Sequence, residues 1–377
     1  MFDRIEDQEL FEETTKRFLE SEAPVTKVRD LVTSTLGYEE SYWRRGAELG
    51  WTSLLVPEEA GGGSVSAWGV LDLIVLAFQF GFHAAPGPLL PVNVVAAALG
   101  RWGSAEQHSE VLSRLLDGSA IASWATSGQV GKARTIEHVR AHTEGEVIVV
   151  DGEVWPIEAG SQSNNFLVTA YHDGGLSHLL IPSGLSGVIV RPLNSLDLTR
   201  RFARLELDGV HVKSSALVGR AGMAAKADSW LKDLAVVVQL AEIVGAMQWA
   251  FETTLAWASN RYTFGRPLNS YQALKHRFAD MKMFLESSYA ITQKAAMAVQ
   301  SSAPDQAELV SAGKFYVGRY GPELMHDCVQ MHGGIGVTFD HDLHIFLRRV
   351  ATNVPLYGSP SDHAARLATL LESANAD

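Results

Sequence analysis

Apolar side chains recur every three to four residues along both ends of the chain, which is the period of an amphipathic α-helix. In the N-terminal part this spacing predicts helices over residues 10–19, 38–49 and 68–80, and the last is dense enough in apolar residues to lie at the centre of a domain. In the C-terminal part the spacing predicts long helices over 221–260, 272–301, 305–331 and 361–373. Four long helices with short connections are typical of a bundle.

Between these parts the apolar residues alternate with polar ones, as they do in strands. Short strands are expected over 167–171, 178–181, 187–190 and 202–212, and an Asp151–Gly152 turn is expected to join 147–150 to 153–157 as a hairpin. The chain is therefore predicted to be α+β and mostly α. It would have an N-terminal helical domain at 1–118, a middle β domain at 119–213 and a C-terminal four-helix bundle at 220–377.

The composition narrows the classes of protein that fit. The 377 residues are 46% hydrophobic and 20% charged, as in an ordinary globular protein, and their net charge of −12 argues against nonspecific binding of nucleic acid. The single cysteine, Cys328, allows no intrachain disulfide and suits a reducing compartment. The acidic start lacks an apolar signal core, and the richest apolar run, 68–82, contains Asp72 and is too short for a bilayer. We therefore expect a cytoplasmic protein with neither nucleic acid nor membrane as partner.

The stretch 261–281, RYTFGRPLNSYQALKHRFADM, brings together the end of one helix and the start of the next. Ser270 is a suitable N-cap, and Leu274 and Phe278 begin the apolar stripe of the second helix. A guanidinium, an aromatic ring, a side-chain amide and a helix N-terminus at one junction suit a flat, anionic ligand such as a dinucleotide. On residue types alone, a plain helical hairpin with a solvated basic loop is the simpler interpretation.

Three stretches, taken in order, favour the dinucleotide site over the plain helical hairpin. They are V-P-E-E-A-G-G at 56–62 with P-G-P at 86–88, R-x-x-F-G-R-P at 261–267 with Gln272, and Q-M-H-G-G-I-G at 330–336 with R-R at 348–349. Their order along nearly the whole chain resembles that of the acyl-CoA dehydrogenase family. The resemblance implies that family's fold, FAD as cofactor, α,β-desaturation of an acyl-CoA thioester, and electron-transfer flavoprotein as the electron acceptor.

The resemblance also implies a flavin site divided between subunits, in which one subunit holds the ring and its neighbour reaches the adenosine and phosphates. The donating elements are present here as Arg261, Phe264, Gln272, Gln330, Gly333 and Gly334. The receiving elements depart from the family pattern. W-A-T-S-G at 124–128, with Thr126, replaces Thr-Glu-Pro, and Trp155 is followed by proline and Ile157 where the family has a hydroxyl residue. Ile157 cannot hydrogen-bond the flavin, whereas Trp155 either flanks the ring or is a core aromatic residue.

The family's reaction needs a carboxylate base close to the substrate. The family's Tyr-Glu-Gly-Thr stretch corresponds to L-Y-G-S-P at 356–360, which puts Tyr357 or Gly358 in place of the glutamate, and the alternative position falls on Ala235. A tyrosine would need a strongly lowered pKa to serve as the base. The nearest other carboxylates are Asp233, Glu242 and Asp362. Each lies off the family's positions and has a simpler structural use, so the sequence leaves the base unknown.

Four histidines, His326, His332, His341 and His344, lie close in sequence but lack the pattern of a metal site, so no metal is expected, and Cys328 is expected in the core. An intact donating half without a base favours one subunit of a heterotetrameric acyl-CoA dehydrogenase, acting on a bulky acyl group such as a steroid side chain. A homologous subunit would then supply the base. Three alternatives stay open: a homo-oligomeric flavoenzyme with a relocated base, a flavin-free scaffold, and a flavin monooxygenase.

Overall fold

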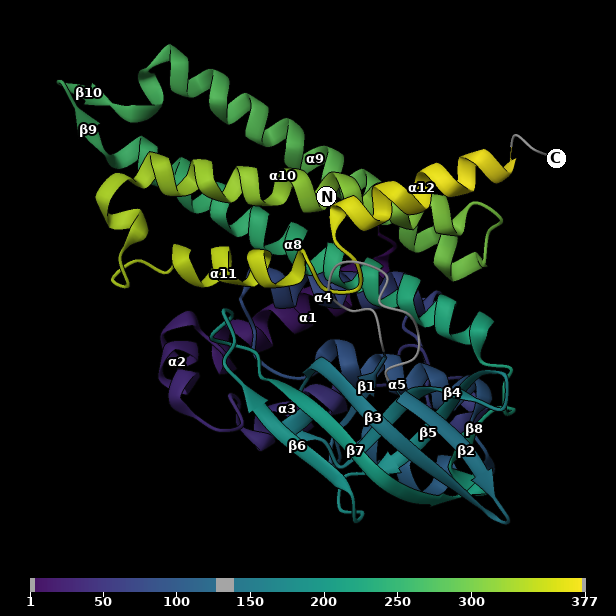
Figure 1. Ribbon diagram of the computed structural model, residues 1–377. Coiled ribbons are helices and arrows are strands. Elements are labelled where there is room, and N and C mark those ends of the chain that lie inside the picture. Colours follow the sequence, from purple (N-terminus) through teal and green to yellow (C-terminus); the bar gives the residue numbers. More distant parts are fainter. Residues whose placement is uncertain (1–3, 127–138, 375–377) are drawn as a thin grey trace.

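The computed structural model describes residues 4–126 and 139–374. Along the chain a β-sheet follows one helical part and precedes another, and Figure 1 shows the sheet at the bottom and the C-terminal helices at the top. The order helix, strand, helix confirms the predicted α+β, mostly α architecture. Helix gives way to strand between Leu116 and Ala122, and helix returns at Ala225. The domain limits 1–118, 119–213 and 220–377 stay predictions. The stretch at 127–128 that was compared with the family's flavin motif lies outside the described residues.

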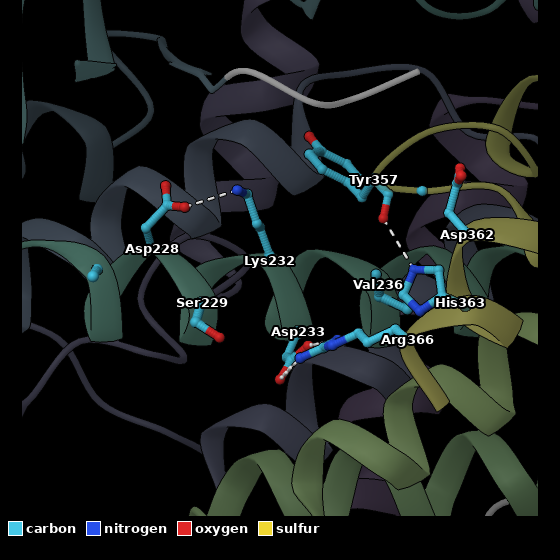
Figure 2. Close-up of a pocket in the computed structure, with 11 residues that line it drawn as sticks. Asp228, Ser229, Lys232, Asp233, Val236, Tyr357, Asp362, His363 and Arg366 are labelled. Atoms are coloured by element: carbon cyan, nitrogen blue, oxygen red, sulfur yellow. Dashed lines mark hydrogen bonds and ion pairs between the residues drawn. The ribbon is translucent and has the colours of Figure 1, made fainter. Parts of the chain in front are cut away.

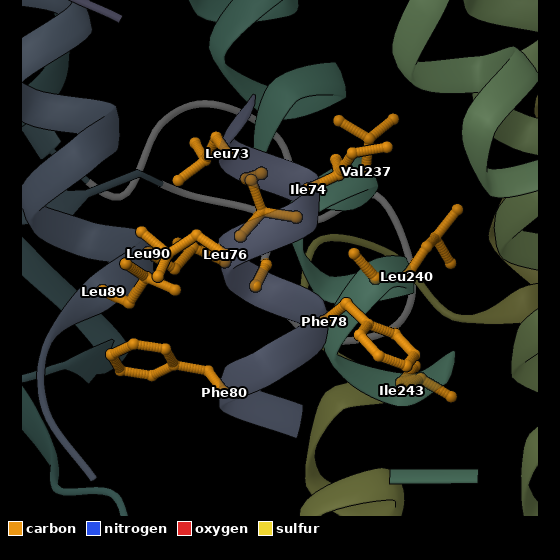
Figure 3. Close-up of a cluster of buried hydrophobic side chains, with 14 of the residues drawn as sticks. Leu73, Ile74, Leu76, Phe78, Phe80, Leu89, Leu90, Val237, Leu240 and Ile243 are labelled. Atoms are coloured by element: carbon orange, nitrogen blue, oxygen red, sulfur yellow. The ribbon is translucent and has the colours of Figure 1, made fainter. Parts of the chain in front are cut away.

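The N-terminal part is helical. Its helices are α1 (Glu6–Glu22), α2 (Val25–Asp30), α3 (Glu40–Glu48), α4 (Gly69–Phe82), α5 (Leu89–Trp102), α6 (Ala105–Gln107) and α7 (Ser113–Leu116). Helix α4 is buried on every side and mostly apolar, as is typical of a helix that is enclosed by others. Figure 3 shows its leucine, isoleucine and phenylalanine side chains between those of α5 and those of the long C-terminal helix α8 (Ala225–Asn260).

Two glycines let α4 and α8 approach closely. A Cβ on Gly245 of α8 would lie 2.1 Å from the carbonyl oxygen of Phe78, and one on Gly81 of α4 would lie 2.0 Å from that of Glu242. Any larger residue would push the helices apart, because real Cβ atoms do not come this close to a backbone oxygen. This contact is the centre of the main hydrophobic core and fixes how the N-terminal part sits on the bundle.

The middle part is one eight-stranded sheet within the described residues. Its strands are β1 (Ala122–Ala125), β2 (Val139–Glu144), β3 (Val147–Glu158), β4 (Asn165–His172), β5 (Gly175–Pro182), β6 (Val188–Leu193), β7 (Phe202–Lys213) and β8 (Leu217–Val218). They lie in the order β6-β7-β3-β2-β4-β5-β8, and β1 pairs with β4 in parallel. The alternating apolar residues of these strands form a second core.

The predicted hairpin turn at Asp151–Gly152 is wrong. Strand β3 runs through this position without turning, and the pairing with β7 shifts register between Val150 and Gly152, so the pair forms a bulge. The hairpin is instead β2–β3, which turns at Gly145, where φ is +63°. Residues such as Asp151 and Gly152 favour both bulges and turns, because both need a backbone that can leave the extended conformation.

The C-terminal part consists of α8 with α9 (Gln272–Ser301), α10 (Gln306–His332), α11 (Leu343–Asn353) and α12 (Pro360–Ala374), and Pro322 lies inside α10. A small hairpin of β9 (Tyr262–Thr263) and β10 (Arg266–Pro267) joins α8 to α9. The sequence predicts Ser270 as the N-cap of α9, and this prediction is wrong. Tyr271 takes that place, and the Ser270 hydroxyl donates to the Pro267 carbonyl at 2.6 Å instead of accepting from a helix N–H group.

Helix α8 also corrects the expectation that no run is long and apolar enough for a bilayer. It has an 18-residue window with a mean hydropathy of 1.6, but 89% of this window is buried inside the protein. The high hydropathy of this window results from burial of α8 on several sides, since α8 contacts α4, α9, α10 and α11.

Two buried arginines join the three parts of the chain. Arg200 of the β6–β7 loop pairs with Glu158 of β3 and lies 3.3 Å from a carboxylate oxygen of Glu242 in α8. Arg349 of α11 lies 3.2 Å from Asp197 in the same loop and donates to backbone carbonyls at and just after the end of α4. Because all these charged groups are buried, they fix the geometry at the place where the three parts meet.

Candidate functional site

The turn between α11 and α12 carries the residues that replace the family's glutamate. Both Tyr357 and Gly358 have a left-handed backbone, with φ of +57° and +101°. Lys314, fully buried in α10, donates to the Leu356 carbonyl at 2.9 Å, and His363 Nε2 donates to the Tyr357 carbonyl at 3.1 Å. The turn is therefore held from two helices.

Neither residue of this turn can act as a base. The Tyr357 ring stacks on Trp124 of β1 with the ring centroids 5.7 Å apart, and burial raises the pKa of its phenol far above the ordinary value. A Cβ on Gly358 would lie 2.8 Å from the His363 ring, so glycine fits at this position and a glutamate would displace that histidine. A tyrosine base would need a lowered pKa, whereas the pKa of Tyr357 is raised.

A cavity of about 320 Å³ lies next to this turn, between α8 and α12 (Figure 2). Its lining residues are Ala225, Asp228, Ser229, Lys232, Asp233, Val236, Tyr357, Gly358, Asp362, His363 and Arg366. Two ion pairs occupy its walls: Lys232 lies 2.8 Å from Asp228 on α8, and Arg366 reaches across from α12 to Asp233 at 2.7 Å. The walls are mostly polar and charged, so they do not form an apolar slot for a hydrocarbon chain.

Each carboxylate that the sequence suggested as a relocated base is bound to other groups. Glu242 is buried and takes hydrogen bonds from Arg200 and from the Asn353 amide, the latter at 3.0 Å. Asp233 is held by Arg366 and by the Gln306 amide at 2.8 Å. Asp362 accepts from the Ser359 backbone N–H at 2.8 Å, as expected of an acid in the first turn of the last helix.

Asp228, which sequence reasoning did not single out, is the centre of a polar network. Thr169 donates to its carboxylate at 2.9 Å and Thr126 at 3.4 Å, and His178 lies at 3.4 Å. Burial alone would raise the pKa of Asp228, but the hydrogen bond with His178 and the charge of Lys232 outweigh it and lower this pKa to about 2. The Thr126 hydroxyl, a candidate flavin contact, is thereby already bonded inside the chain.

The other receiving residues are divided between the two faces of β3. Ile157 is fully buried, and Trp155 is 49% exposed with the Arg204 guanidinium 5.2 Å from its ring centroid. Trp155 is therefore not the hairpin core aromatic that the sequence allowed. It is an open aromatic face with a cation beside it.

The donating residues lie together at the far end of the bundle, where α8, the β9–β10 hairpin and the end of α10 meet (Figure 1). Phe264 is 94% exposed, and a Cβ on Gly333 or Gly334 would find no atom within 4 Å. Gln272 and Gln330 are exposed as well. These groups face outward, where another molecule can reach them.

Trp257 connects the two donating motifs. The Arg261 guanidinium lies 5.9 Å from the Trp257 ring centroid, and the other stacking partner of Trp257 is His332, the residue before Gly333, at 5.2 Å. The sequence gave no sign of this link, because a tryptophan at helical spacing is usually a core residue. The motifs at 261–265 and 330–334 therefore form one surface.

The receiving and donating residues lie at opposite ends of α8. Asp228, which binds Thr126, is in its first turn, and Arg261 follows its last residue. The 33 residue steps from Asp228 to Arg261 span about 50 Å at the rise of an α-helix. The two groups within one chain are thus too far apart to converge on the same part of one ligand.

The histidines and the cysteine have structural surroundings. His332 Nδ1 donates to the Cys328 carbonyl at 2.8 Å, and the rings of His332 and His341 are 4.5 Å apart. Over residues 4–126 and 139–374 there is no group of three metal-binding side chains. Cys328 is buried, as expected, and burial raises the pKa of its thiol to about 12, so the thiol is inert.

Known proteins resemble this chain over almost its full length. A family model described as the acyl-CoA dehydrogenase N-terminal domain matches residues 5–119, and one described as the acyl-CoA dehydrogenase C-terminal domain matches residues 236–363. The acyl-CoA dehydrogenase IpdE2 of Mycobacterium tuberculosis is 28% identical over 364 residues, which cover 96% of each chain.

Two solved structures are similar in fold. A chain of the ChsE4–ChsE5 complex from Mycobacterium tuberculosis matches with a TM-score of 0.89 at 25% identity, over 99% of both chains. A variant of the Tcur3481–Tcur3483 steroid ACAD matches with a TM-score of 0.88, also at 25% identity and over 99% of both chains. Each of these structures is named for two different polypeptides.

Proposed function

The chain belongs to the acyl-CoA dehydrogenase family of FAD-dependent oxidoreductases, and we propose that it works as one subunit of a hetero-oligomeric acyl-CoA dehydrogenase. In this assembly it contributes Arg261, Phe264, Gln272, Gln330, Gly333 and Gly334 to an FAD whose ring is held by a homologous partner. The partner also supplies the carboxylate base. FAD, when bound, accepts the hydride that leaves the substrate.

One observation carries this proposal: the position of the base holds no carboxylate, and the carboxylates around it are committed elsewhere. Tyr357 stays protonated and Gly358 has no side chain. Asp233 faces Arg366, and Glu242 faces Arg200. A base that abstracts a proton must be free to reach the substrate, and both of these carboxylates are already bonded to an arginine of the same chain.

The exposed end of the bundle supports the donating role. The Arg261 guanidinium can pair with a phosphate, and the open Gly333–Gly334 backbone lets a pyrophosphate approach without a side chain in the way. The exposed Phe264 ring adds an apolar surface for a neighbouring chain. Arg261, Phe264 and the two glycines therefore fit a nucleotide presented by another subunit.

The receiving residues fit FAD less well. Ile157 offers no hydrogen bond, and Thr126 is bonded to Asp228, so among the described receiving residues only Trp155 is available to flank a flavin ring. We assign no step of the reaction to this chain's own receiving site. Its contribution is to hold and orient the cofactor of its neighbour.

The similar two-polypeptide structures suggest the substrate class. Because one of them is titled a steroid ACAD, we propose a bulky acyl-CoA thioester, such as one with a steroid side chain, as the substrate of the assembly. Electron-transfer flavoprotein is the proposed electron acceptor, and the cytoplasm is the proposed compartment, which suits the single cysteine, Cys328.

A self-sufficient homo-oligomer is the second candidate. It is favoured by one observation: Asp233 and Asp362 line the cavity beside Tyr357, so a carboxylate is at least close to the right place. In that case Asp233 would have to leave Arg366 when substrate binds.

Co-expression tests the proposal. The chain is produced alone and together with homologous acyl-CoA dehydrogenases from the same genome, and each preparation is examined by its visible absorption and by reduction of its flavin with acyl-CoA thioesters. We expect flavin and desaturation in the pair and neither at full level in the single chain. Full FAD occupancy and turnover in the single chain would overturn the proposal, and loss of that turnover in Asp233→Asn would establish the homo-oligomer instead.

A further inference from the structure

The connection between α10 and α11, residues 333–342, begins with two glycines of the donating surface, Gly333 and Gly334, and leads to a buried histidine, His344. Figure 1 shows this connection at the same end of the bundle as the β9–β10 hairpin. The proposed function uses the two glycines, but it gives no role to the histidines that lie on either side of them. The hydrogen bonds and charges around these histidines determine how firmly the connection is held.

The start of α11 depends on an unprotonated histidine. The backbone N–H of Leu343, the first residue of α11, donates to Nδ1 of His341 at 3.1 Å. Nδ1 can accept this hydrogen bond only while it carries no proton, because both nitrogens of an imidazolium are donors. An imidazolium at His341 would therefore leave a first-turn N–H group of the helix without its partner.

His344 has no partner that could stabilise a charge. This residue is 9% exposed, and among the described residues neither Nδ1 nor Nε2 of its ring has a hydrogen-bond partner. The ring packs against the exposed ring of Phe339, with the centroids 4.6 Å apart. Protonation of the closed structure would bury a positive charge together with two unpaired N–H groups, which is far more costly than burying the neutral ring.

The charged groups around His344 oppose its protonation. Arg29 of α2 and Arg348 of α11 both act on its ring with positive charge, and a protonated His341 would add a third. Asp342 is the acid that favours the charged ring, but it lies 2.7 Å from Nε of Arg29 and is shared with that guanidinium. Burial, followed by the two arginines, lowers the pKa of His344. Burial also lowers the pKa of His341.

A third histidine connects this group to the donating surface. The His332 ring lies 4.5 Å from that of His341 and stacks on the Trp257 ring at 5.2 Å, both measured between centroids. The Arg261 guanidinium lies 5.9 Å from the centroid of the same tryptophan ring. Burial lowers the pKa of His332, and His341 acts in the same direction. A proton on either of these two rings is therefore opposed by the other.

We propose that the α10–α11 connection is an acid-sensitive switch that controls the donating surface. At neutral pH, His341 and His344 are uncharged and the connection is closed. It then presents Gly333 and Gly334 in a fixed place to the FAD of the partner subunit. In mild acid the two histidines bind protons when the connection opens to water, so the protons stabilise the open form and the glycines lose their place. The opening belongs to this chain alone, whereas its effect on the cofactor rests on the proposed function.

The direction and size of the effect follow from proton binding. An unhindered histidine titrates at about pH 6.5, whereas His341 and His344 stay neutral to a lower pH while the connection is closed. The closed form is therefore fully favoured above about pH 6.5 and loses stability relative to the open form as the pH falls. For each ring that titrates at about pH 6.5 in the open form alone, opening increases about tenfold between about pH 7.5 and about pH 5.5.

Hydrogen exchange of the full chain alone, followed by NMR, measures the opening. The relevant amides are those of Thr338, Leu343 and Ile345, whose N–H groups form hydrogen bonds within this segment. Their protection factors, corrected for the intrinsic effect of pH on exchange, are compared at about pH 7.5 and about pH 5.5. We expect protection in the wild type to fall by about tenfold or more in acid.

Variants that cannot bind the proton test the cause. In the double variant His341→Asn/His344→Gln, asparagine keeps an acceptor for the Leu343 N–H and neither side chain titrates, so protection should change less than about threefold. His344→Phe, which keeps a ring beside Phe339, replaces His344→Gln if the double variant folds poorly. His326→Gln replaces an exposed histidine of α10. It is the matched control and should respond as the wild type does.

The co-expressed assembly tests the effect on the cofactor. The FAD that stays bound after ultrafiltration is measured at the same two pH values in the wild type and in the double variant. We expect acid to release about threefold more FAD, or more than that, from the wild type than from the double variant.

Two results would overturn the proposal. The first is protection that does not fall in the wild type, or that falls equally in the double variant, since these histidines would then not drive an opening. The second is equal release of FAD from the two assemblies, since the opening would then not control the donating surface. The exchange experiment needs neither flavin nor a partner subunit, so its result is independent of the co-expression test that decides the proposed function.

Discussion

Replacing Arg349 by methionine should destabilise the protein strongly, because this side chain is 1% exposed and serves four groups. Its Nε lies 3.2 Å from the buried Asp197 carboxylate, its terminal nitrogens donate to the Phe80 carbonyl at 3.0 Å and the Ala85 carbonyl at 2.8 Å, and Thr199 is its fourth partner. Methionine fills much of the volume but pairs with none of them.

The expected loss follows from the carboxylate that remains. Breaking a buried ion pair by removing one partner costs about 3–5 kcal/mol of unfolding free energy, since an uncompensated charge stays behind. Arg349 and Arg200 lower the pKa of Asp197, against burial, which raises it. Without Arg349 this group takes up a proton or draws water in, and either process is unfavourable. A loss of this size is a large part of the ~5–15 kcal/mol that stabilises a typical domain.

Urea denaturation of Arg349→Met measures the loss through the shift of the midpoint. The neighbouring Arg348→Met is the control, because Arg348 is only half-buried and makes one long hydrogen bond, 3.4 Å, to the Leu196 carbonyl. We expect less than about 1 kcal/mol for this control. Adding Asp197→Asn to Arg349→Met should recover part of the loss, since it removes the stranded charge. A midpoint for Arg349→Met equal to that of Arg348→Met would refute the reasoning.

Three further predictions concern the site. Burial lowers the pKa of His363 to about 4, so the folded state keeps this ring neutral. The contribution of neutral His363 to the free energy of unfolding is complete above pH 6.5 and falls by about 3 kcal/mol as the pH drops to 4. In His363→Asn, the free energy of unfolding measured by denaturation should therefore depend less on pH over this range. Tyr357→Phe should change the turnover of the co-expressed assembly less than about twofold, because a phenol with a raised pKa is not the base; a loss of about a hundredfold would contradict this. Arg261→Gln should lower the FAD affinity of the assembly about tenfold or more, whereas Lys275→Gln, an exposed cation of α9, should leave it unchanged, and equal affinities measured by ultrafiltration would exclude the donating role.

The helices could be predicted from the sequence because their apolar spacing is a local property. Residues 272–301 were predicted as a helix and form α9 with the same limits. The strand at 147–158 was split in two, since Asp151 and Gly152 favour a turn in isolation, and the pairing with β7 that turns them into a bulge lies more than 50 residues away. Local propensity identifies such residues as irregular but does not say in which way.

The candidate site divides in the same manner. The absence of a carboxylate at residues 356–358 could be predicted, because it concerns only residue identity. The ion pair of Asp233 with Arg366 joins residues 133 apart, and the Trp257–His332 stack joins two helices, so neither has a local signature. Asp228 and Lys232 are four residues apart on one helix face, a spacing that allows an ion pair, but the sequence analysis did not identify this pair.

Helix α8 has a consequence for how such a protein evolves. One end of this helix is next to the chain's own cavity, and the other end presents Arg261 to whatever lies beyond the bundle. Under the proposed function, a mutation near Asp228 would act on the chain's own cavity, and a mutation near Arg261 would act on the cofactor of the partner subunit. Natural selection can relax at the first end while it continues at the second, so two descendants of one gene can divide the labour of a single ancestral catalyst.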